Sequence, residues 1–339
     1  MRIGVVGCGH WGPNHIRVFS QLSGSTVTCA ADPDAKRRAV VAGQFSGVDV
    51  VDDYNALVRR PDVDAVVVCV PTRKHEEVTR AALEAGKHVL CEKPLTVGTA
   101  EALALTDLAA SRGLILMTGH VFLFNPGILK LRDLMMSGQP GRIHYLRALR
   151  TNLGPIRQDV NSVYDLASHD ISIFNFLLEA EPVTASAVGA SFLRPGIEDV
   201  AFITLTYPNG VVGAIQVSWL DPKKLREIVV VGDTKMVVWD ELAPAGPISI
   251  YDKSVVREQY YDDFGQFHLL AREGDLTIPR VPPQEPLKVQ NQYFLDAVKS
   301  GYLGKSDGAF SVSVVRVLEA IARSIAQGGA PVPVAQESK

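Results

Sequence analysis

The chain has 339 residues, of which 47% are hydrophobic and 21% are charged, and its formal net charge at pH 7 is −3. This composition excludes a disordered chain, and the length exceeds what one hydrophobic core usually organises, which favours two domains. The small negative charge, with no basic run longer than Lys36-Arg37-Arg38, argues against a nucleic-acid-binding protein, so we expect a small-molecule partner.

The sequence enters an apolar run at its second residue and has no apolar stretch of membrane-spanning length. We therefore expect no signal peptide, no membrane partner and a cytoplasmic location. The cysteines form no CxxC pair, so we expect reduced, buried thiols at all four positions, which are Cys8, Cys29, Cys69 and Cys91.

Between residue 1 and about residue 118, short β-branched runs alternate with amphipathic stretches. This pattern is typical of βα units that build a parallel sheet covered by helices. Helices are expected over 76–85 and 99–112, because Gly86 and Gly113 follow as stop signals. The expected strands are 3–6, 27–31, 48–51, 65–70, 88–91 and 114–117.

After Asn125-Pro126 the sequence predicts one more helix, and from about Gly141 longer strands alternate polar with apolar residues. Pro208-Asn209-Gly210 and Gly232-Asp233-Thr234 carry the residues that hairpin turns require, which indicates an antiparallel sheet. Its expected strands are 143–151, 185–191, 200–207, 211–219, 227–231, 235–240 and 248–251. Helices over 167–178, 286–300 and 309–327 would cover one sheet face or return to the first domain.

The segment Gly7-Cys8-Gly9-His10-Trp11-Gly12 follows the first expected strand and opens a helix, which is the context of a dinucleotide-binding fingerprint. Its glycines allow close approach of a pyrophosphate to the helix N-terminus, although a glycine turn without a nucleotide is the alternative. Asp32 ends the second strand, where a carboxylate would bind the ribose hydroxyls and repel a 2′-phosphate. NAD is therefore favoured over NADP, while Arg37 and Arg38 leave dual use open. Asp32 could also cap the helix after Pro33.

These observations predict an α/β protein, with an N-terminal Rossmann parallel sheet plus a C-terminal α+β domain that has a large, mostly antiparallel open sheet. We expect residues 1–120 to form the NAD-binding domain and residues 121–339 to form the substrate-binding and oligomerisation domain. One face of the second sheet is left over after its helices pack, and its apolar residues predict a homodimer or homotetramer.

Two more segments end at the carboxyl edge of the parallel sheet, where open α/β sheets bind ligands: Pro71-Thr72 with His75, and Glu92-Lys93-Pro94. With residues 7–12, 85–89 and 165–170, they make the sequence resemble the Gfo/Idh/MocA family (glucose-fructose oxidoreductase, inositol dehydrogenase, rhizopine catabolism) over essentially the whole chain. The resemblance implies an NAD-dependent dehydrogenase acting on CH–OH groups. The implied cofactor contacts are Gly7, Gly9, His10, Trp11, Gly12, Asp32, Pro71, Thr72, His75, Glu92 and Lys93.

In similar enzymes the lysine, here Lys93, binds the oxygen at the carbon that loses hydride, while Asp165 and His169 handle the proton. An ammonium group stabilises a developing alkoxide but needs a partner base. Asp165 and His169 are four residues apart, so one helical turn would put them on the same side, with the carboxylate orienting the imidazole. The alternatives are an exposed loop lysine and a satisfied core histidine. No metal is expected, because this pair lacks a third clustered ligand.

The segment 150–161 precedes the helix of Asp165 and is expected to lie over the active-site cleft. Arg157 suits a carboxylate or phosphate, and Asn152 and Asn161 suit hydroxyls, so they join the three catalytic candidates as substrate-binding residues; a solvated loop arginine is the alternative for Arg157. The family commonly places an arginine before the asparagine-proline step, and here Leu123-Phe124-Asn125-Pro126 has none, which puts that substrate contact in doubt. Lys93-Pro94 is also a candidate cis peptide, and the sequence leaves the isomer open.

Segments 150–161, 165–173 and 218–222 look like the family branch near bacterial nucleotide-sugar dehydrogenases. The favoured substrate is therefore a UDP-sugar such as a UDP-N-acetylglucosamine-uronate oxidised at C3. A free sugar or inositol-type polyol dehydrogenase is the first alternative, and a catalytically silent NAD-binding sensor is the second. A silent sensor should have lost the lysine or its proton partner, whereas Lys93, Asp165 and His169 are all present, which favours an enzyme.

Overall fold

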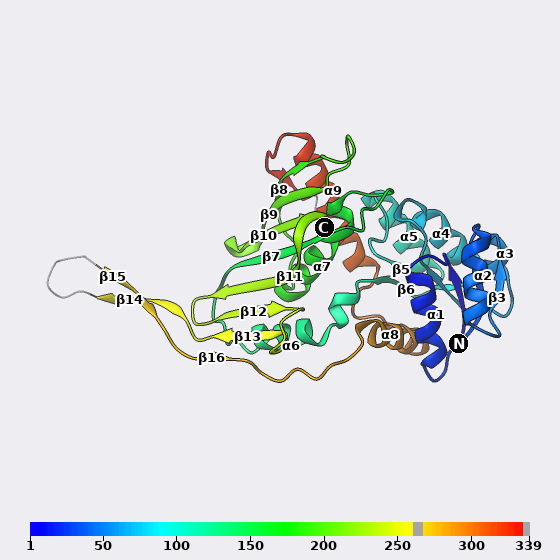
Figure 1. Ribbon diagram of the computed structural model, residues 1–339, viewed down its shortest axis with the longest axis horizontal. Helices are drawn as coiled ribbons and strands as arrows, with labels where there is room; N and C mark the ends of the chain where they lie inside the picture. Colours follow the sequence, from blue (N-terminus) through cyan, green and yellow to red (C-terminus); the bar gives the residue numbers. More distant parts are fainter. Residues whose placement is uncertain (260–266, 335–339) are drawn as a thin grey trace. The chain divides into compact units, whose positions relative to one another are not determined.

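The computed structural model describes residues 1–259 and 267–334. They form two compact units (Figure 1), of which the first comprises Met1–Phe124, Gln158–Val160 and Gln284–Glu319. The other described residues form the second unit. The first unit thus takes in more than the expected residues 1–120, because residues 158–160 and 284–319 pack against the N-terminal segment.

In the first unit, the described residues form a six-stranded parallel sheet in the order β3-β2-β1-β4-β5-β6. This order reverses direction between β1 and β4, which is the switch point at which doubly wound sheets bind dinucleotides. The strands are β1 (Arg2–Val6), β2 (Thr26–Ala31), β3 (Asp49–Val51), β4 (Ala65–Val68), β5 (His88–Glu92) and β6 (Leu116–Gly119). The predicted Rossmann sheet is confirmed.

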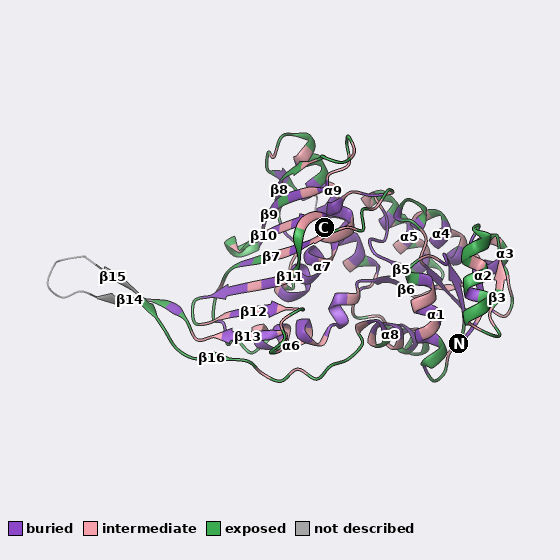
Figure 2. Ribbon diagram, in the orientation of Figure 1, coloured by how far each residue is buried: buried purple, intermediate pink, exposed green. Residues whose placement is uncertain are grey.

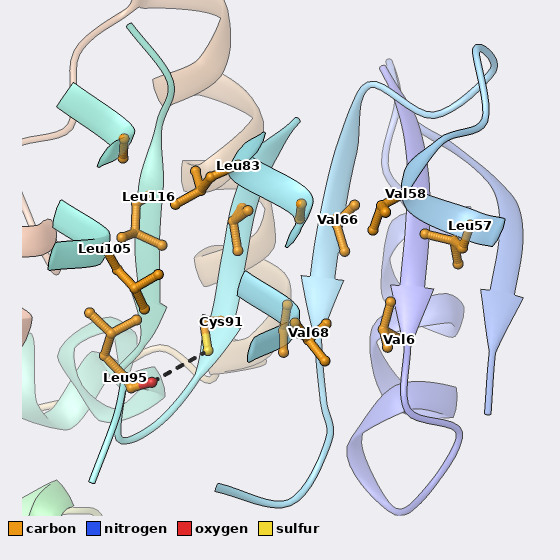
Figure 3. Packing of buried hydrophobic residues seen from close by; sticks show 14 of the residues in the cluster. Val6, Leu57, Val58, Val66, Val68, Leu83, Cys91, Leu95, Leu105 and Leu116 are labelled. Atoms are coloured by element: carbon orange, nitrogen blue, oxygen red, sulfur yellow. Dashed lines mark hydrogen bonds between the residues drawn. The ribbon is translucent and has the colours of Figure 1, made fainter. Parts of the chain in front are cut away.

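The helices of this unit cover the sheet because its strands are apolar on both sides; all four residues of β4, for example, are buried. One continuous core joins β1, β4, β5 and β6 to α3, α4, α5 and α9 (Figure 3). Elsewhere in the unit Phe19 of α1 packs edge-on against Phe294 of α8, with ring centroids 6.5 Å apart. The helices are α1 (Trp11–Gln21), α2 (Ala35–Gln44), α3 (Tyr54–Val58), η1 (Thr72–Lys74), α4 (His75–Glu84), α5 (Thr99–Ser111), η2 (Val121–Phe124), α8 (Pro286–Ser300) and α9 (Gly308–Ala326), of which α9 belongs to this unit as far as Glu319.

The second unit has an open sheet whose described strands follow the order β16-β13-β12-β11-β7-β10-β9-β8-β17. Adjacent strands are antiparallel except β7 and β10, which are parallel, so the sheet is mostly antiparallel, as predicted. The strands are β7 (Ile143–Leu153), β8 (Thr184–Ala190), β9 (Val200–Thr206), β10 (Val212–Ser218), β11 (Leu220–Gly232), β12 (Met236–Asp240), β13 (Ile248–Tyr251), β16 (Leu276–Thr277) and β17 (Val332–Pro333).

Three local features of this unit differ from the sequence expectations. The helix expected over 167–178 begins earlier, as a π-helical turn, η3 (Val163–Ala167), which leads into α7 (Ser168–Leu178). A hairpin of β14 (Ser254–Gln259) and β15 (Phe267–Arg272) was not predicted, and neither were β16 and β17. The two predicted turns are confirmed, since η4 (Pro208–Gly210) joins β9 to β10 and Gly232-Asp233-Thr234 joins β11 to β12.

Buried residues alternate with more exposed ones along strands of this sheet (Figure 2), which indicates one buried face and one exposed face. Along β9, Ala201, Ile203 and Leu205 are buried, whereas the intervening Phe202 and Thr204 are exposed. The helix α6 (Pro126–Met136) packs against α7, β12 and β13. Within the described part of the chain, no helix is both long and apolar enough to cross a bilayer.

The core of the second unit contains a buried ion pair between β7 and α7. The Arg150 guanidinium donates through Nη2 to Asp170 Oδ1 at 2.7 Å and through Nε to Asp170 Oδ2 at 3.0 Å. Their side chains are only 4% and 1% exposed. This pair fixes α7, and with it the turn that carries Asp165 and His169, to the central strand of the sheet.

We expect Arg150→Met to lower the free energy of unfolding by about 3–5 kcal/mol, because Asp170 is left as an uncompensated buried charge. The double variant Arg150→Met/Asp170→Leu should lose clearly less, since no charge remains to be desolvated. Urea unfolding followed by tryptophan fluorescence measures both, because Trp219 and Trp239 are buried in this unit. Equal losses in the single and double variants would contradict this account of the pair.

Candidate active site

The glycine loop between β1 and α1 has the geometry of a pyrophosphate cradle. Gly7 has φ 98°, and a Cβ there would lie 2.5 Å from the carbonyl oxygen of Cys69, so other residues are excluded. A Cβ on Gly12 would collide with the Gly7 carbonyl oxygen. A Cβ on Gly9 would meet only Arg37 Nη1, at 4.0 Å, so this side of the loop is open to a ligand.

The N-terminus of α1 faces this loop without a competing group. Its N-cap residue, His10, makes no side-chain capping hydrogen bond, and no acidic residue lies in the first turn. The unsatisfied N–H groups and the positive end of the helix dipole therefore remain available to an anion. His10 and Trp11 lie at this start of the helix with their ring centroids 5.3 Å apart, and both are exposed.

Asp32 lies at the end of β2 and is 4% exposed. Its Oδ2 accepts a hydrogen bond from the Cys8 backbone N at 2.8 Å, and its Oδ1 accepts one from the Asp34 backbone N at 2.8 Å. Each carboxylate oxygen has a second acceptor site, so both can still receive a ribose hydroxyl. The cap of α2 is Asp34, which accepts from the Lys36 and Arg37 backbone N atoms, so Asp32 does not have the capping role.

The strands β4 and β5 bring the next candidates to the same edge of the sheet. His75 is 1% exposed, with Nδ1 2.7 Å from the Pro94 carbonyl oxygen and Nε2 3.0 Å from the Val70 carbonyl oxygen. It therefore ties the loop after β4 to the loop after β5. Thr72, beside Pro71, is 1% exposed, and its backbone N donates to Asp159 Oδ2 at 2.9 Å. Lys93-Pro94 is a cis peptide bond.

Glu92 ends β5 and Lys93 follows it, and both charged residues are buried, 9% and 7% exposed. Glu92 Oε1 lies 3.0 Å from His15 Nε2, and the Lys93 backbone N donates to Glu92 Oε2 at 3.3 Å. Burial raises the pKa of Glu92, but the hydrogen bond from His15 and the charges of Lys93 and His75 outweigh it, so the pKa is lowered. The carboxylate is thus ionised at neutral pH.

His120 follows β6 at this edge and is a neutral residue. It is 1% exposed, and burial together with the charge of Lys93 lowers its pKa to about 3. Its ring packs edge-on against Phe310 with centroids 5.6 Å apart. Within the described residues neither ring nitrogen has a hydrogen-bond partner. Lys93 is therefore bordered by one anion, Glu92, and by an uncharged imidazole.

In the second unit, the carboxylate of Asp165 lies in the π-helical turn η3. Its Oδ2 accepts from Trp219 Nε1 at 3.1 Å, and its Oδ1 lies 3.4 Å from Arg157 Nη1. Trp219 is fully buried, so this contact fixes the carboxylate against the sheet. His169 follows four residues later in the first turn of α7, where the helix has become α-helical. A π turn widens the helix locally and is frequent at functional sites.

The predicted substrate residues of the second unit lie near Asp165 in the chain but have partners of their own. Asn161 Nδ2 donates to Glu198 Oε2 at 2.6 Å, and Asn152 Nδ2 donates to the Gly154 carbonyl oxygen. Arg157 is 29% exposed, and its carbonyl oxygen accepts from Arg194 Nη2. Arg194 therefore contacts the backbone of Arg157, and the Arg157 guanidinium lies against Asp165.

Some residues of these sites were not anticipated from the sequence. His15 lies on the apolar side of α1, three residues after Gly12, where it reads as a core histidine. Asn291 and Asp159 are remote in sequence from their partners His15 and Thr72. Trp219 lies in the segment 218–222, which the sequence marks only by its resemblance to the nucleotide-sugar branch of the family. No local pattern marks these contacts, because each depends on how distant segments pack.

The comparisons with known proteins assign the family. Residues 1–120 match the profile described as oxidoreductase family, NAD-binding Rossmann fold, and residues 128–238 match the Gfo/Idh/MocA C-terminal domain. The chain belongs to the Gfo/Idh/MocA family. It is therefore an oxidoreductase of this family, and its first unit binds NAD, as the sequence predicted.

Relatives within the Gfo/Idh/MocA family differ in substrate. The chain is 31% identical to inositol 2-dehydrogenase 2 of Saccharopolyspora erythraea, covering 99% of this chain and 97% of the relative. It is 35% identical to UDP-N-acetylglucosamine 3-dehydrogenase of Acidithiobacillus ferrooxidans, covering 64% of this chain and 67% of the relative. The solved structure of the latter enzyme matches with a TM-score of 0.79 and 28% identity, covering 96% and 97% of the two chains.

We expect Asp32→Ala to weaken NAD binding about 10-fold or more, because the ribose loses a charged hydrogen-bond acceptor worth about 1.5–3 kcal/mol. NADP binding should change less, since the repulsion of the 2′-phosphate is removed as well. Asp34→Ala is the matched control: it removes the cap of α2 and about 1 kcal/mol of stability but leaves NAD affinity unchanged. Titration calorimetry with both dinucleotides measures this, and NADP binding more tightly than NAD to the unaltered protein would contradict the role of Asp32.

Proposed function

We propose that this protein catalyses hydride transfer between NAD and a carbon that carries a hydroxyl or keto group in a sugar, with Lys93, Asp165 and His169 as its catalytic residues. The observation that carries the proposal is the position of Lys93, which directly follows β5 at the carboxyl edge of the NAD-binding sheet, beside an ionised Glu92. The presence of Asp165 and His169 in the second unit supports an active enzyme over a silent sensor.

Each proposed catalytic residue has a role that its chemistry supports. The bound nicotinamide would supply the site that accepts or returns the hydride. Lys93 binds the reacting oxygen through its ammonium group and stabilises the alkoxide that develops there. His169 accepts the hydroxyl proton, as an imidazole can near neutral pH, and Asp165 stabilises the imidazolium that forms. Trp219 and Arg157 hold the Asp165 carboxylate in place.

We further propose that residues 1–120 form the NAD-binding domain and residues 121–339 the substrate-binding domain. The direct cofactor contacts would come from the glycine loop, the helix start and Asp32, with Pro71 and Thr72 beside the nicotinamide half. His75 and Glu92 would act by bracing the loops from within, because both are buried and already hydrogen bonded. The direct contacts of the glycine loop and helix start are Gly7, Gly9, His10, Trp11 and Gly12.

As substrate we propose a nucleotide sugar of the UDP-N-acetylglucosamine-uronate type, oxidised at C3. Arg157, beside Asp165, and Arg194, on the backbone of Arg157, support this choice, since guanidinium groups suit a diphosphate or carboxylate, which a cyclitol lacks. Asn152 and Asn161 would bind sugar hydroxyls. An inositol-type polyol is the second candidate, because a relative that matches over nearly the full length is an inositol 2-dehydrogenase.

The exposed face of the second sheet is proposed to bind a second copy of the chain. Phe202 and Val188 are each 51% exposed there, and they border a hollow of about 400 Å³ that Arg147 also lines. Apolar patches of this kind favour a symmetric dimer or tetramer. Light scattering should show a dimer or tetramer, and a monomer at micromolar concentration would remove this proposal.

The free thiols support a cytoplasmic location.

Lys93→Ala should lower kcat by about 10²–10⁴-fold while NAD affinity is retained, and His169→Ala should lower it by a similar factor because proton transfer is lost. Lys87→Ala is the control, since Lys87 Nζ donates to the Arg60 and Val63 carbonyl oxygens rather than to the residues of the site. The assay follows NADH formation with UDP-sugars, free sugars and inositols. If none of them reduces NAD, and no keto-sugar oxidises NADH, the enzyme proposal fails.

A further inference from the structure

A chain of buried polar side chains in the first unit leads from α8 to the end of β5. Asn291 Nδ2 lies 3.1 Å from His15 Nδ1, and His15 Nε2 lies 3.0 Å from Glu92 Oε1. Asn291 and His15 are fully buried, and Glu92 is 9% exposed. The three residues come from distant parts of the sequence, and the chain of contacts ends at the carboxylate that accepts from the Lys93 backbone N.

The direction of these hydrogen bonds follows from the groups involved. An amide nitrogen carries only donors, so His15 Nδ1 must accept from Asn291. The single ring proton of the neutral imidazole is then on Nε2, where it faces the Glu92 carboxylate. Asn291 thus selects the tautomer in which His15 donates to Glu92. The two hydrogen bonds together fix the orientation of the imidazole ring and of the carboxylate.

The carboxylate at the end of this chain is coupled to Lys93. The Lys93 backbone N donates to Glu92 Oε2, and the charge of Lys93 favours the ionised form of Glu92. Such coupling is reciprocal, so ionised Glu92 favours the ammonium form of Lys93 by the same free energy. The charge of His75 also lowers the pKa of Glu92, while His120 is neutral and burial keeps the nearby thiols of Cys69 and Cys91 protonated.

We propose that His15 and Asn291 are positioning residues that act on Lys93 through Glu92. They hold the carboxylate ionised and in one orientation, so that Lys93 stays an ammonium group aimed at the reacting oxygen. Without the His15 hydrogen bond, Glu92 would be a buried carboxylate with one oxygen unsatisfied, which favours its protonation and removes the anion beside Lys93. The proposal rests on the proposed function of Lys93, but its structural core can be tested without turnover.

The test follows the Lys93 amine directly, by NMR of the full-length protein with saturating NAD and biosynthetically incorporated [ε-¹³C]lysine. The resonance is assigned by its disappearance in Lys93→Arg. We expect Glu92→Gln to move its titration midpoint down by about 1–3 pH units, the usual effect of removing a close opposite charge. His15→Leu should move it in the same direction, whereas His15→Gln should largely restore it, because the amide can still donate to Glu92.

His88→Leu is the matched control, a histidine substitution at the opposite end of the same strand, where the side chain accepts from the Ile115 backbone N. It should leave the midpoint unchanged. Asn291→Ala provides a second route if His15→Leu does not fold, and it should shift the midpoint less than Glu92→Gln does. Circular dichroism and NAD titration report whether each variant is folded.

The proposal is overturned if Glu92→Gln leaves the midpoint unchanged, or if His15→Gln shifts it as far as His15→Leu. A failed substrate search would not affect this readout, so the two proposals fail separately. Where turnover is found, His15→Leu should lower kcat about 10-fold with little change in KM and should shift the pH profile of kcat, whereas a residue that only stabilises the fold would lower the active fraction without moving the profile.

Discussion

All the chemistry of the first unit depends on one geometric constraint, the parallel direction of its strands. A parallel sheet puts the carboxyl ends of all its strands at one edge, and the strand order reverses between β1 and β4, the position at which doubly wound sheets bind dinucleotides. The glycine loop, Asp32 and Lys93 follow three different strands and yet share this edge. Asp32 and Lys93 are buried there, because helices cover both faces of the sheet.

Burial at that edge makes each charge dependent on a partner. Glu92 is ionised because His15 donates to it, and in the second unit Asp170 is stabilised by a bidentate contact with Arg150. Neither pair is proposed to contact the substrate. The Glu92 pair positions Lys93, and the Asp170 pair positions the helix that carries His169. Hydrophobic packing thus gives the scaffold, and a few buried polar contacts determine how its functional groups are oriented and charged.

The sequence predicted the elements whose signal is local, and it missed those that depend on distant packing. The apolar run of β4 and the glycines before α1 each specify their structure within a few residues. The β14–β15 hairpin has no such signal, and neither has β17, which pairs with β8 at the sheet edge. The turn at Asp165 is π-helical, with hydrogen bonds between residues five apart instead of four, and no residue pattern separates it from the start of an α-helix. The sequence does not distinguish His15 from a core histidine, because its partners Asn291 and Glu92 are distant in the sequence.

The central claim is that this protein oxidises a sugar carbon by hydride transfer to NAD with Lys93 at the reacting oxygen. The most direct measurement uses a UDP-N-acetylglucosamine-uronate carrying deuterium at C3, with C2-deuterated inositol as the second candidate, and determines by mass spectrometry where the deuterium goes. The account predicts that NADH acquires the label from one of them and that Lys93→Ala abolishes the transfer. Label-free NADH, or no transfer from either compound, would contradict it.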